Sequence, residues 1–375
     1  MSVSQPYSIG IEEEYLLVDA RSRALASASE GLLADLADAL GKRVTTEFLT
    51  CQVEVGTDVC DTVEAARADL GRLRRIVADC ARAHGLRPIA ASCHPFGDWK
   101  EQNRTDKPRY NRLDDDLGAV ARRMLIGGMH VHVGLPDRDA RIAAMNQLSY
   151  FLPHLLALSA SSPFWQGRDT GLASYRMTIF DSMPRTGLPP RMRDWDDWCA
   201  RVDALVGLEV IDDASKIWWD LRPSSKFPTI ETRICDVSPR IEDTLTLAAL
   251  TQALVRFLCR RAEAGDPWRE TEPLIVAENR WRAQRYGVKE GLIDSGVRRI
   301  VPVPDLVDEL LELLDDDLAA LGSRETAARA RRIAAEGTSA DRQRRQRAAH
   351  EGDDHAALCA VVDGLAEEFL EGIDG

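Results

Sequence analysis

The segment Ser8–Val18 (Ser-Ile-Gly-Ile-Glu-Glu-Glu-Tyr-Leu-Leu-Val) places three consecutive carboxylates inside an apolar, β-branched stretch. Its composition predicts a strand. Alternate side chains of a strand share a face, so Glu12 and Glu14 lie on the side of Gly10, whereas Glu13 lies in the opposite, apolar row. Two carboxylates about 7 Å apart repel each other unless a cation or a proton intervenes. The segment therefore predicts either a cation-binding strand or a solvated edge strand whose charges discourage aggregation.

Composition excludes several classes of protein. The chain has 375 residues, 45% hydrophobic and 29% charged, which is ordinary for a soluble enzyme with a substantial core. A net charge of −13 argues against a nucleic-acid partner, and the Arg-rich stretch 324–347 also carries Ala, Glu and Asp at helical spacing. No apolar run approaches a membrane span, no signal peptide is recognisable, and the eight cysteines form no Cys-x-x-Cys pair. We expect a cytoplasmic protein with reduced thiols and no membrane partner.

Three further predicted strands also have one apolar face and one face with acidic, histidine or arginine side chains. They are Cys51–Val55 with Glu54, Met124–Gly134 with His130 and His132, and Thr229–Asp236 with Glu231 and Arg233. If all four strands belong to one antiparallel sheet, their polar faces line a single surface. Such a surface is too costly to bury without compensation, and a metal ion is the usual compensation. Mostly oxygen ligands with one or two imidazoles favour Mg²⁺ or Mn²⁺ over Zn²⁺.

The order of the predicted elements indicates the fold class. Strands concentrate in the first two-thirds of the chain, and helices dominate the last third, which predicts an α+β fold. The expected helices are Ala140–Ala160, Ile241–Ala264, Glu272–Tyr286 and Asp305–Leu321, and Ser161–Pro190 is expected to be irregular. We find no internal repeat and no linker, so we expect one catalytic domain over residues 1–375, with a helical C-terminal portion at about 304–375.

Three arginines add to the chemistry of the acidic surface. Arg176, Arg222 and Arg233 lie in or beside apolar, aromatic stretches, where a guanidinium needs an anionic partner. That partner is either a protein carboxylate or a bound phosphate. Metal-binding carboxylates together with such arginines are the parts required for phosphoryl transfer from a nucleotide. Neither a P-loop, nor a Rossmann fingerprint, nor a Gly-x-Ser-x-Gly elbow is present.

Several segments, in order over about residues 7 to 300, resemble glutamate–cysteine ligase family 2, whose members are carboxylate–amine ligases with a glutamine-synthetase-like fold. They are Gly10-Ile-Glu-Glu-Glu-Tyr15, Thr46-Glu-Phe48, Gln52-Val-Glu-Val-Gly-Thr-Asp58, His94-Pro95, Gly128-Met-His-Val-His-Val-Gly134, Ala173-Ser-Tyr-Arg176, Trp219-Asp-Leu-Arg-Pro223, Thr229-Ile-Glu-Thr-Arg-Ile-Cys-Asp236 and Asn279-Arg-Trp-Arg-Ala-Gln-Arg-Tyr-Gly287. The C-terminal helices match only in length and character.

The resemblance implies a curved antiparallel sheet with helices on its convex side and a concave face that binds ATP, metal ions and an acid substrate. The metal ligands that it implies are Glu12, Glu14, Glu47, Glu54, His130 and Glu231. Arg222 and Arg233 would bind the nucleotide, and Glu54, Arg176 and Arg233 would carry the catalysis. Glu47 is added by the resemblance alone, and His132 stays outside this set. The resemblance also makes a homodimer plausible.

We therefore expect an ATP-dependent ligase that uses Mg²⁺ or Mn²⁺ and joins a small carboxylate to a small amine through an acyl phosphate. Glutamate and cysteine are the substrate pair that the family suggests. Two alternatives stay open. In one, His130 and His132 bind zinc in a hydrolase. In the other, the acidic face binds a cation for structure only, without catalysis.

Overall fold

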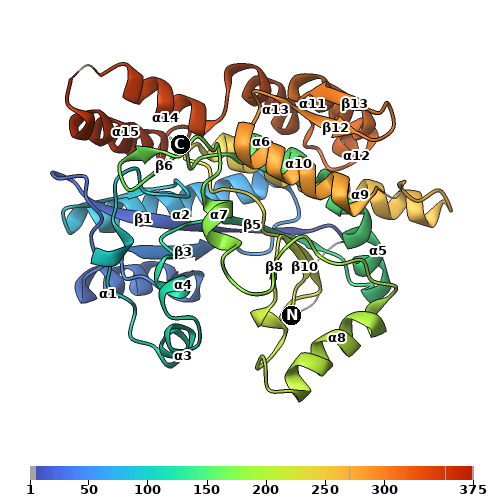
Figure 1. The fold of residues 1–375 in the computed structure, drawn as a ribbon, viewed down its shortest axis with the longest axis horizontal. Coiled ribbons are helices and arrows are strands. Elements are labelled where there is room, and N and C mark those ends of the chain that lie inside the picture. Colours follow the sequence, from blue (N-terminus) through green and yellow to red (C-terminus); the bar gives the residue numbers. More distant parts are fainter. Residues whose placement is uncertain (1–5, 270, 351, 374–375) are drawn as a thin grey trace.

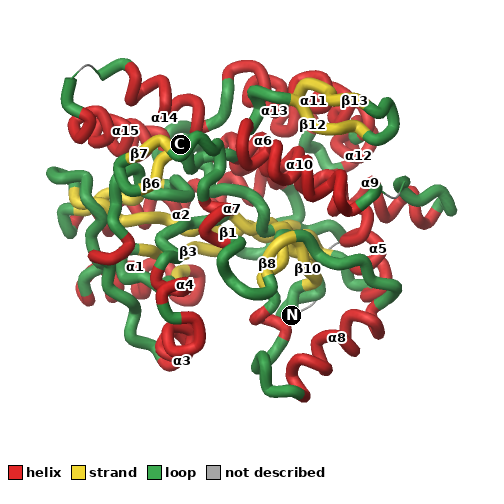
Figure 2. The backbone as a smooth tube through the Cα atoms, in the orientation of Figure 1, coloured by secondary structure: helices red, strands yellow, loops and turns green. Residues whose placement is uncertain are grey.

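The structure is a computed structural model that describes residues 6–269, 271–350 and 352–373. An antiparallel sheet of seven strands runs through the middle of the molecule, and helices surround it (Figures 1 and 2). The strand order is β10-β11-β5-β1-β3-β2, and β4 pairs with the second half of β1. The strands are β1 (Ile9–Asp19), β2 (Val44–Thr46), β3 (Gln52–Gly56), β4 (Leu86–Ile89), β5 (Met129–Gly134), β10 (Leu221–Pro223) and β11 (Thr229–Thr232).

Helices make up most of the rest of the chain. They are α1 (Glu30–Leu40), α2 (Val63–Ala83), α3 (Pro108–Leu117), α4 (Ala119–Arg122), α5 (Arg138–Leu148), α6 (Leu152–Ser159), α7 (Arg176–Phe180), α8 (Trp195–Gly207), α9 (Ile241–Glu263), α10 (Pro273–Tyr286), α11 (Val303–Leu313), α12 (Asp315–Ala320), α13 (Arg324–Glu336), α14 (Ser339–Ala348) and α15 (Asp354–Glu368). Short strand pairs are β6 (Phe164–Trp165) with β7 (Arg168–Asp169), β8 (Thr186–Gly187) with β9 (Trp218–Trp219), and β12 (Gly291–Asp294) with β13 (Arg299–Pro302).

One face of the sheet forms the main core. Ile11 and Val131 on this face are buried in one cluster with Leu36 of α1, Leu70 of α2 and Leu250 of α9. Burying an aliphatic side chain of this size stabilises the fold by about 1.5–3 kcal/mol, so strand alternation and helix periodicity act together here. The cluster also takes in side chains of α5, α11 and α13, which joins the early strands to the C-terminal helices.

The other face of β1 changes character along the strand. Glu12 and Glu14 occupy it first, and then Leu16 and Val18 enter a second apolar cluster with Val361 of α15. The polar part of this face is therefore limited to the half of β1 that pairs with β5 and β3. The second apolar cluster, which includes residues of α15, covers the remaining half of this face of β1.

The α+β class and the antiparallel sheet are confirmed, but several predicted boundaries are wrong. The strand expected over Thr229–Asp236 ends at Thr232, because its regular pairing with β5 stops there and resumes only as the isolated bridge between Gly128 and Asp236, displaced by one residue. The strand expected from Met124 begins only at Met129. The helix expected over Ala140–Ala160 is split into α5 and α6 by a 3₁₀ turn that is followed by Pro153.

Two further expectations missed short elements. The segment Ser161–Pro190, expected to be irregular, contains β6, β7, α7 and β8. The C-terminal third was expected to be helical, but it includes the β12–β13 hairpin, and the expected helix Asp305–Leu321 is divided into α11 and α12. Among the described residues, no helix is long and apolar enough to cross a membrane.

The third glutamate of the opening segment explains how a charge fits into the main core. Glu13 and Arg74 of α2 both have fully buried side chains and form a bidentate pair, with bonds of 2.6 and 2.9 Å. The hydroxyls of Tyr15 and Thr244 each donate a 2.6 Å bond to the same carboxylate. Arg74 also donates to the backbone oxygens of Ser238 and Pro239. The pair therefore ties β1 to α2 and to the start of α9.

Replacing Arg74 with methionine should lower the free energy of unfolding by about 3–5 kcal/mol, because Glu13 would remain as an uncompensated buried charge. Urea denaturation measures the change. The matched control is Arg82→Met on the same helix, whose exposed pair with Asp79 should contribute less than about 1 kcal/mol. Equal losses in the two variants would show that the buried pair does not stabilise the fold in this way.

Candidate active site

The strand register brings the predicted site residues of β1, β3 and β5 onto one surface. Glu12 of β1 lies opposite His130 of β5, and Glu14 lies opposite Glu54 of β3. Directly paired residues of antiparallel strands point to the same face, so these four side chains must converge. They do: His130 lies 3.1 Å from Glu12 through Nδ1 and 4.0 Å from Glu14 through Nε2, and carboxylate oxygens of Glu14 and Glu54 lie within 4.8 Å of each other.

The next strand adds the residues from the later part of the chain. Glu231 of β11 lies opposite His132 of β5 on one side and opposite Arg222 of β10 on the other. Arg233 follows the end of β11 and still reaches Glu231 with its Nη1 group. The surface predicted from four separate segments is therefore a single surface.

The first acidic group on this surface consists of Glu14, Glu47 and Glu54. One carboxylate oxygen of each lies within 4.8 Å of the others. Burial, followed by the charge of Glu14, raises the pKa of Glu47 to about 7, and burial together with Glu47, Glu12 and Glu14 raises the pKa of Glu54 well above its usual range. Three carboxylates this close cannot all ionise without a cation. The group has the all-oxygen composition that Mg²⁺ or Mn²⁺ prefers.

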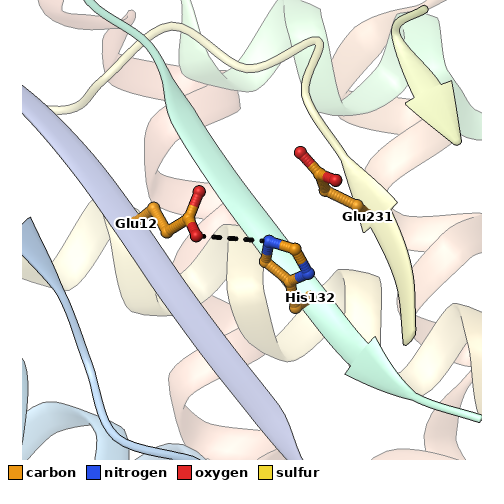
Figure 3. A group of neighbouring side chains, drawn as sticks. All are labelled: Glu12, His132 and Glu231. Carbon is orange, nitrogen blue, oxygen red and sulfur yellow. Dashed lines mark ion pairs between the residues drawn. The ribbon is translucent and has the colours of Figure 1, made fainter. Parts of the chain in front are cut away.

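Glu12, His132 and Glu231 form a second group with donor atoms within 4.8 Å of one another (Figure 3). His132 Nε2 lies 3.5 Å from Glu12 Oε1, and Nδ1 lies 2.9 Å from the hydroxyl of Thr229. Burial raises the pKa of Glu12, but the hydrogen bonds of His130 and His132 outweigh it, so the net pKa is lowered. Glu12 is therefore held as a carboxylate, ready to accept a cation.

His130 lies between the two acidic groups rather than inside either of them. Its Nδ1 atom contacts Glu12, and its Nε2 atom lies 4.0 Å from Glu14 Oε1. His132 is not among the predicted ligands, yet it is the histidine that lies in a group of three donors, together with Glu12 and Glu231. The signal was present in the sequence, because strand alternation places both histidines on the same face. The ligand roles of all these side chains remain predictions.

Glu231 is bracketed by two arginines. Arg222 donates to it through Nε (2.9 Å) and Nη2 (3.2 Å), and Arg233 donates to it from the other side. Burial raises the pKa of Glu231, but the charge of Arg233 and then of His132 outweighs burial, so the net pKa lies well below the usual range. From the sequence, we expect these arginines to meet either a carboxylate or a phosphate. In the structure both donate to the carboxylate of Glu231, and Arg222 also donates to the backbone oxygens of Ser215 and Ile217.

Arg176 occupies a different environment. Its buried guanidinium bonds to the backbone oxygens of Arg233 (3.1 Å) and Ile234 (3.3 Å) and lies over the ring of Phe180. It presses against Gly128, where an added Cβ would lie 2.4 Å from Nη2. The amide of Gly128 donates a 2.7 Å bond to Glu14. Gly128 therefore links Arg176 to the first acidic group, a role that a glycine in a motif does not reveal from sequence alone.

Two buried guanidinium donors on this surface have no hydrogen-bond partner among the described residues. They are the Nε groups of Arg176 and Arg233. A buried donor without an acceptor costs free energy, and an anion is the natural acceptor for an arginine. Acidic groups that need cations and arginines that need anions fit the binding of a metal–nucleotide complex.

Comparisons with known proteins identify the family to which the chain belongs. The model of glutamate–cysteine ligase family 2 matches residues 8–361. A protein of Jannaschia sp. named "Putative glutamate--cysteine ligase 2" is 58% identical over 367 residues, 97% of each chain, and a protein of the same name from Ruegeria pomeroyi is 55% identical over 98% of this chain and 96% of its own.

Among solved structures, glutamate–cysteine ligase of Francisella tularensis in complex with AMP has a TM-score of 0.70 at 13% identity. The superposition covers 100% of this chain and 91% of the Francisella tularensis chain. A bifunctional glutathione synthetase from Pasteurella multocida has a TM-score of 0.69 at 15% identity over 98% of this chain and 53% of its own. These likenesses show the fold. The family match over nearly the whole length and the relatives above 50% identity show that the chain belongs to glutamate–cysteine ligase family 2, a family of ATP-dependent carboxylate–amine ligases.

Proposed function

We propose that this protein uses ATP to join the γ-carboxylate of glutamate to the amine of cysteine, forming γ-glutamylcysteine. The observation that carries the proposal is the convergence of two acidic groups and three arginines on one face of the sheet in a chain of this family. The names of the relatives support the substrate pair. The AMP complex of the Francisella tularensis ligase supports adenine nucleotide use.

The residues that would hold divalent cations are Glu14, Glu47 and Glu54 in one group, and Glu12, His132 or His130, and Glu231 in the other. Two carboxylate-rich groups, each with donor atoms within 4.8 Å of one another, fit Mg²⁺ or Mn²⁺. Bound Mg²⁺ or Mn²⁺ would neutralise the negative charge of the nucleotide's phosphates. This fit rests on the close approach of the three carboxylates of the first group, and burial together with their mutual repulsion raises the pKa of Glu47 and Glu54.

The arginines would act on the anions of the reaction. Arg233, with a free Nε donor, would stabilise the phosphoryl group during transfer from ATP to the acid substrate. Arg222 would hold Glu231 in place and complete the nucleotide site from the rim. Arg176, whose Nε donor is also free, would bind a phosphate or carboxylate oxygen over Gly128.

The proposed reaction has two steps. A carboxylate oxygen of the acid attacks the terminal phosphorus of ATP, so ADP leaves and an acyl phosphate forms. The amine attacks the carbonyl carbon of the acyl phosphate, the C–O bond to phosphate breaks, and the amide and inorganic phosphate are released after the nitrogen loses a proton.

The two alternatives have less support. A zinc hydrolase would need several imidazole or thiolate ligands around His130 and His132, but carboxylates outnumber imidazoles in both groups. A cation site with a structural role alone does not account for the free donors of Arg176 and Arg233. A cytoplasmic location and a homodimer remain predictions.

Replacing Glu54 with glutamine should lower the rate of ATP-dependent amide formation by at least about 100-fold, because even the loss of a residue that only supports a metal ligand costs 10–100-fold. The fold should persist, since the change removes a charge that burial disfavours. Mass spectrometry of the product and thermal unfolding measure the two effects. Glu64→Gln, at an exposed position of α2, is the control. Full turnover by Glu54→Gln would contradict the metal assignment.

Mg²⁺ binding should tighten as the pH rises from 6 to 8. The pKa of Glu47 without metal is about 7, so below that pH a proton must leave before the cation binds. Each released proton corresponds to about tenfold in affinity per pH unit below the pKa of its group, so Glu47 contributes this slope below pH 7, and Glu54, whose pKa is also raised, adds to it. Calorimetry in buffers of different ionisation enthalpy counts the protons. Glu47→Gln should reduce the slope; an unchanged slope would exclude Glu47 as a proton source.

Glutamate and cysteine together should give the fastest ADP formation in a panel of amino acids with Mg²⁺ and ATP. The acid arm varies glutamate against aspartate and other acids with cysteine constant, and the amine arm varies cysteine against serine and other amines with glutamate constant. Omission of either substrate should reduce ADP release to the background rate. A different acid–amine pair that gives faster turnover would replace the proposed substrates and keep the ligase chemistry.

A further inference from the structure

Arg280 of α10 binds two carboxylates at once beside the candidate site. Its Nη1 and Nη2 groups donate to Asp181 at 2.8 and 2.7 Å, and its Nε and Nη2 groups donate to Asp220 at 2.6 and 3.2 Å. The Asp220 side chain is fully buried, and 11% of the Arg280 side chain is exposed. Asp181 directly follows α7, the five-residue helix that begins with Arg176. Arg280 therefore fixes the C-terminal end of the helix that carries a predicted catalytic arginine.

Gln284 holds the other parts of the same segment. It lies four residues after Arg280, so both side chains are on one face of α10. Its side-chain amide donates a 2.7 Å bond to the hydroxyl of Thr178 within α7. Its backbone oxygen accepts bonds from the amides of Ala173 and Ser174, just before α7. One face of α10 thus holds the segment before, within and after α7.

The second partner of Arg280 connects it to the other arginines of the site. The backbone oxygen of Asp220 accepts a 2.8 Å bond from the amide of Arg233. Arg222 lies two residues after Asp220, on β10. A rigid ion pair between Arg280 and Asp220 therefore sets the backbone from which Arg222 projects and to which Arg233 is bonded.

Arg176 has little tolerance for movement. Its guanidinium rests on the backbone of Gly128 with less space than a methyl group requires, and it bonds to the oxygens of Arg233 and Ile234. A shift of α7 by about 1 Å would break these contacts, and misplacement on this scale costs catalysis up to about 100-fold. The placement of α7 is thus a condition for the placement of the guanidinium.

We propose that Arg280, supported by Gln284, is a positioning residue that fixes Arg176 against the site by bridging Asp181 and Asp220. The inference rests on the proposed function, in which Arg176 binds an anionic group of the reactants. An arginine is required because its planar fork presents donors to both carboxylates, whereas a lysine ammonium is a compact point charge that cannot reproduce the two paired geometries.

Steady-state kinetics of Arg280→Lys test the proposal. The variant should lower kcat/KM by about 10- to 100-fold at a thermal unfolding temperature close to that of Arg342→Lys. Arg342 is a matched control, because its guanidinium also bonds a carboxylate bidentately, at Glu368, and lies near Asp243, but on α14. Arg342→Lys should leave kcat/KM within about twofold of the wild type. Equal kinetic losses in the two variants would overturn the proposal.

A double-mutant cycle separates positioning from general stability. In the Arg176→Lys background, adding Arg280→Lys should cause less than about a twofold further loss in kcat/KM, because the group being positioned has already been changed. If the loss in kcat/KM of the double variant equals the product of the losses in the two single variants, Arg280 does not act through Arg176.

Hydrogen exchange provides a readout that does not depend on catalysis. Amides in residues 173–181 should exchange about tenfold faster or more in Arg280→Lys and Gln284→Ala than in the wild type, whereas Arg342→Lys should leave them unchanged. If wild-type protein forms no ADP with any acid and amine, the proposed function fails, and exchange still decides whether Arg280 holds α7. Unchanged protection of this segment would overturn the positioning role.

Discussion

The mutual repulsion of carboxylates on one face of the sheet is the constraint on which the rest of the site depends. Glu14, Glu47 and Glu54 bring three oxygens within 4.8 Å of one another, and the pKa values of Glu47 and Glu54 rise in response. On the neighbouring strands, by contrast, Glu231 is compensated by the chain's own arginines. Among the described residues, Glu14, Glu47 and Glu54 therefore lack the arginine partners that Glu231 has, and this shortage of positive charge supports the proposed cation in their group.

Three consecutive glutamates of β1 show how strand alternation divides one sequence motif between two tasks. Glu12 and Glu14 face the site, whereas Glu13 enters the main core and pairs with Arg74. The buried pair, with the hydroxyls of Tyr15 and Thr244, holds β1 against α2 and α9. Because both faces of β1 are anchored by charge, its register fixes which carboxylates meet. A shift by one residue would place Glu13 in the site and two charges in the core.

The sequence predicted much of the site because each strand carried its own period-two signal. Glu12, Glu54, His130 and Glu231 could be assigned to one face from alternation alone, and their convergence required only that the strands pair. Glu47 could not be found this way, since it follows β2 outside any strand and only family resemblance pointed to it. The boundaries that failed lie where the pairing of a strand shifts register, as after Thr232, or where Pro153 follows a 3₁₀ turn within a helical pattern.

Arg280 illustrates a kind of residue that local patterns do not reveal. Its motif on α10 reads as an ordinary polar helix face, and its two partners lie 99 and 60 positions away in the chain. Their importance arises from the elements they join, namely α7 and the turn before β10. Distant ion pairs of this kind have no periodicity, so neither spacing nor composition predicts them.

The amino-acid sequence by itself determined the fold class, the strands with one acidic face, and most of the residues on that face, because alternation and burial are local properties of the chain. Only the tertiary structure decided that the carboxylates separate into two groups, that His132 joins one of them, and that Arg222 and Arg233 bracket Glu231. The reason is physical. Repulsion and pairing between charges depend on distances of a few ångströms, and those distances are set by the register of strands that are far apart in the sequence.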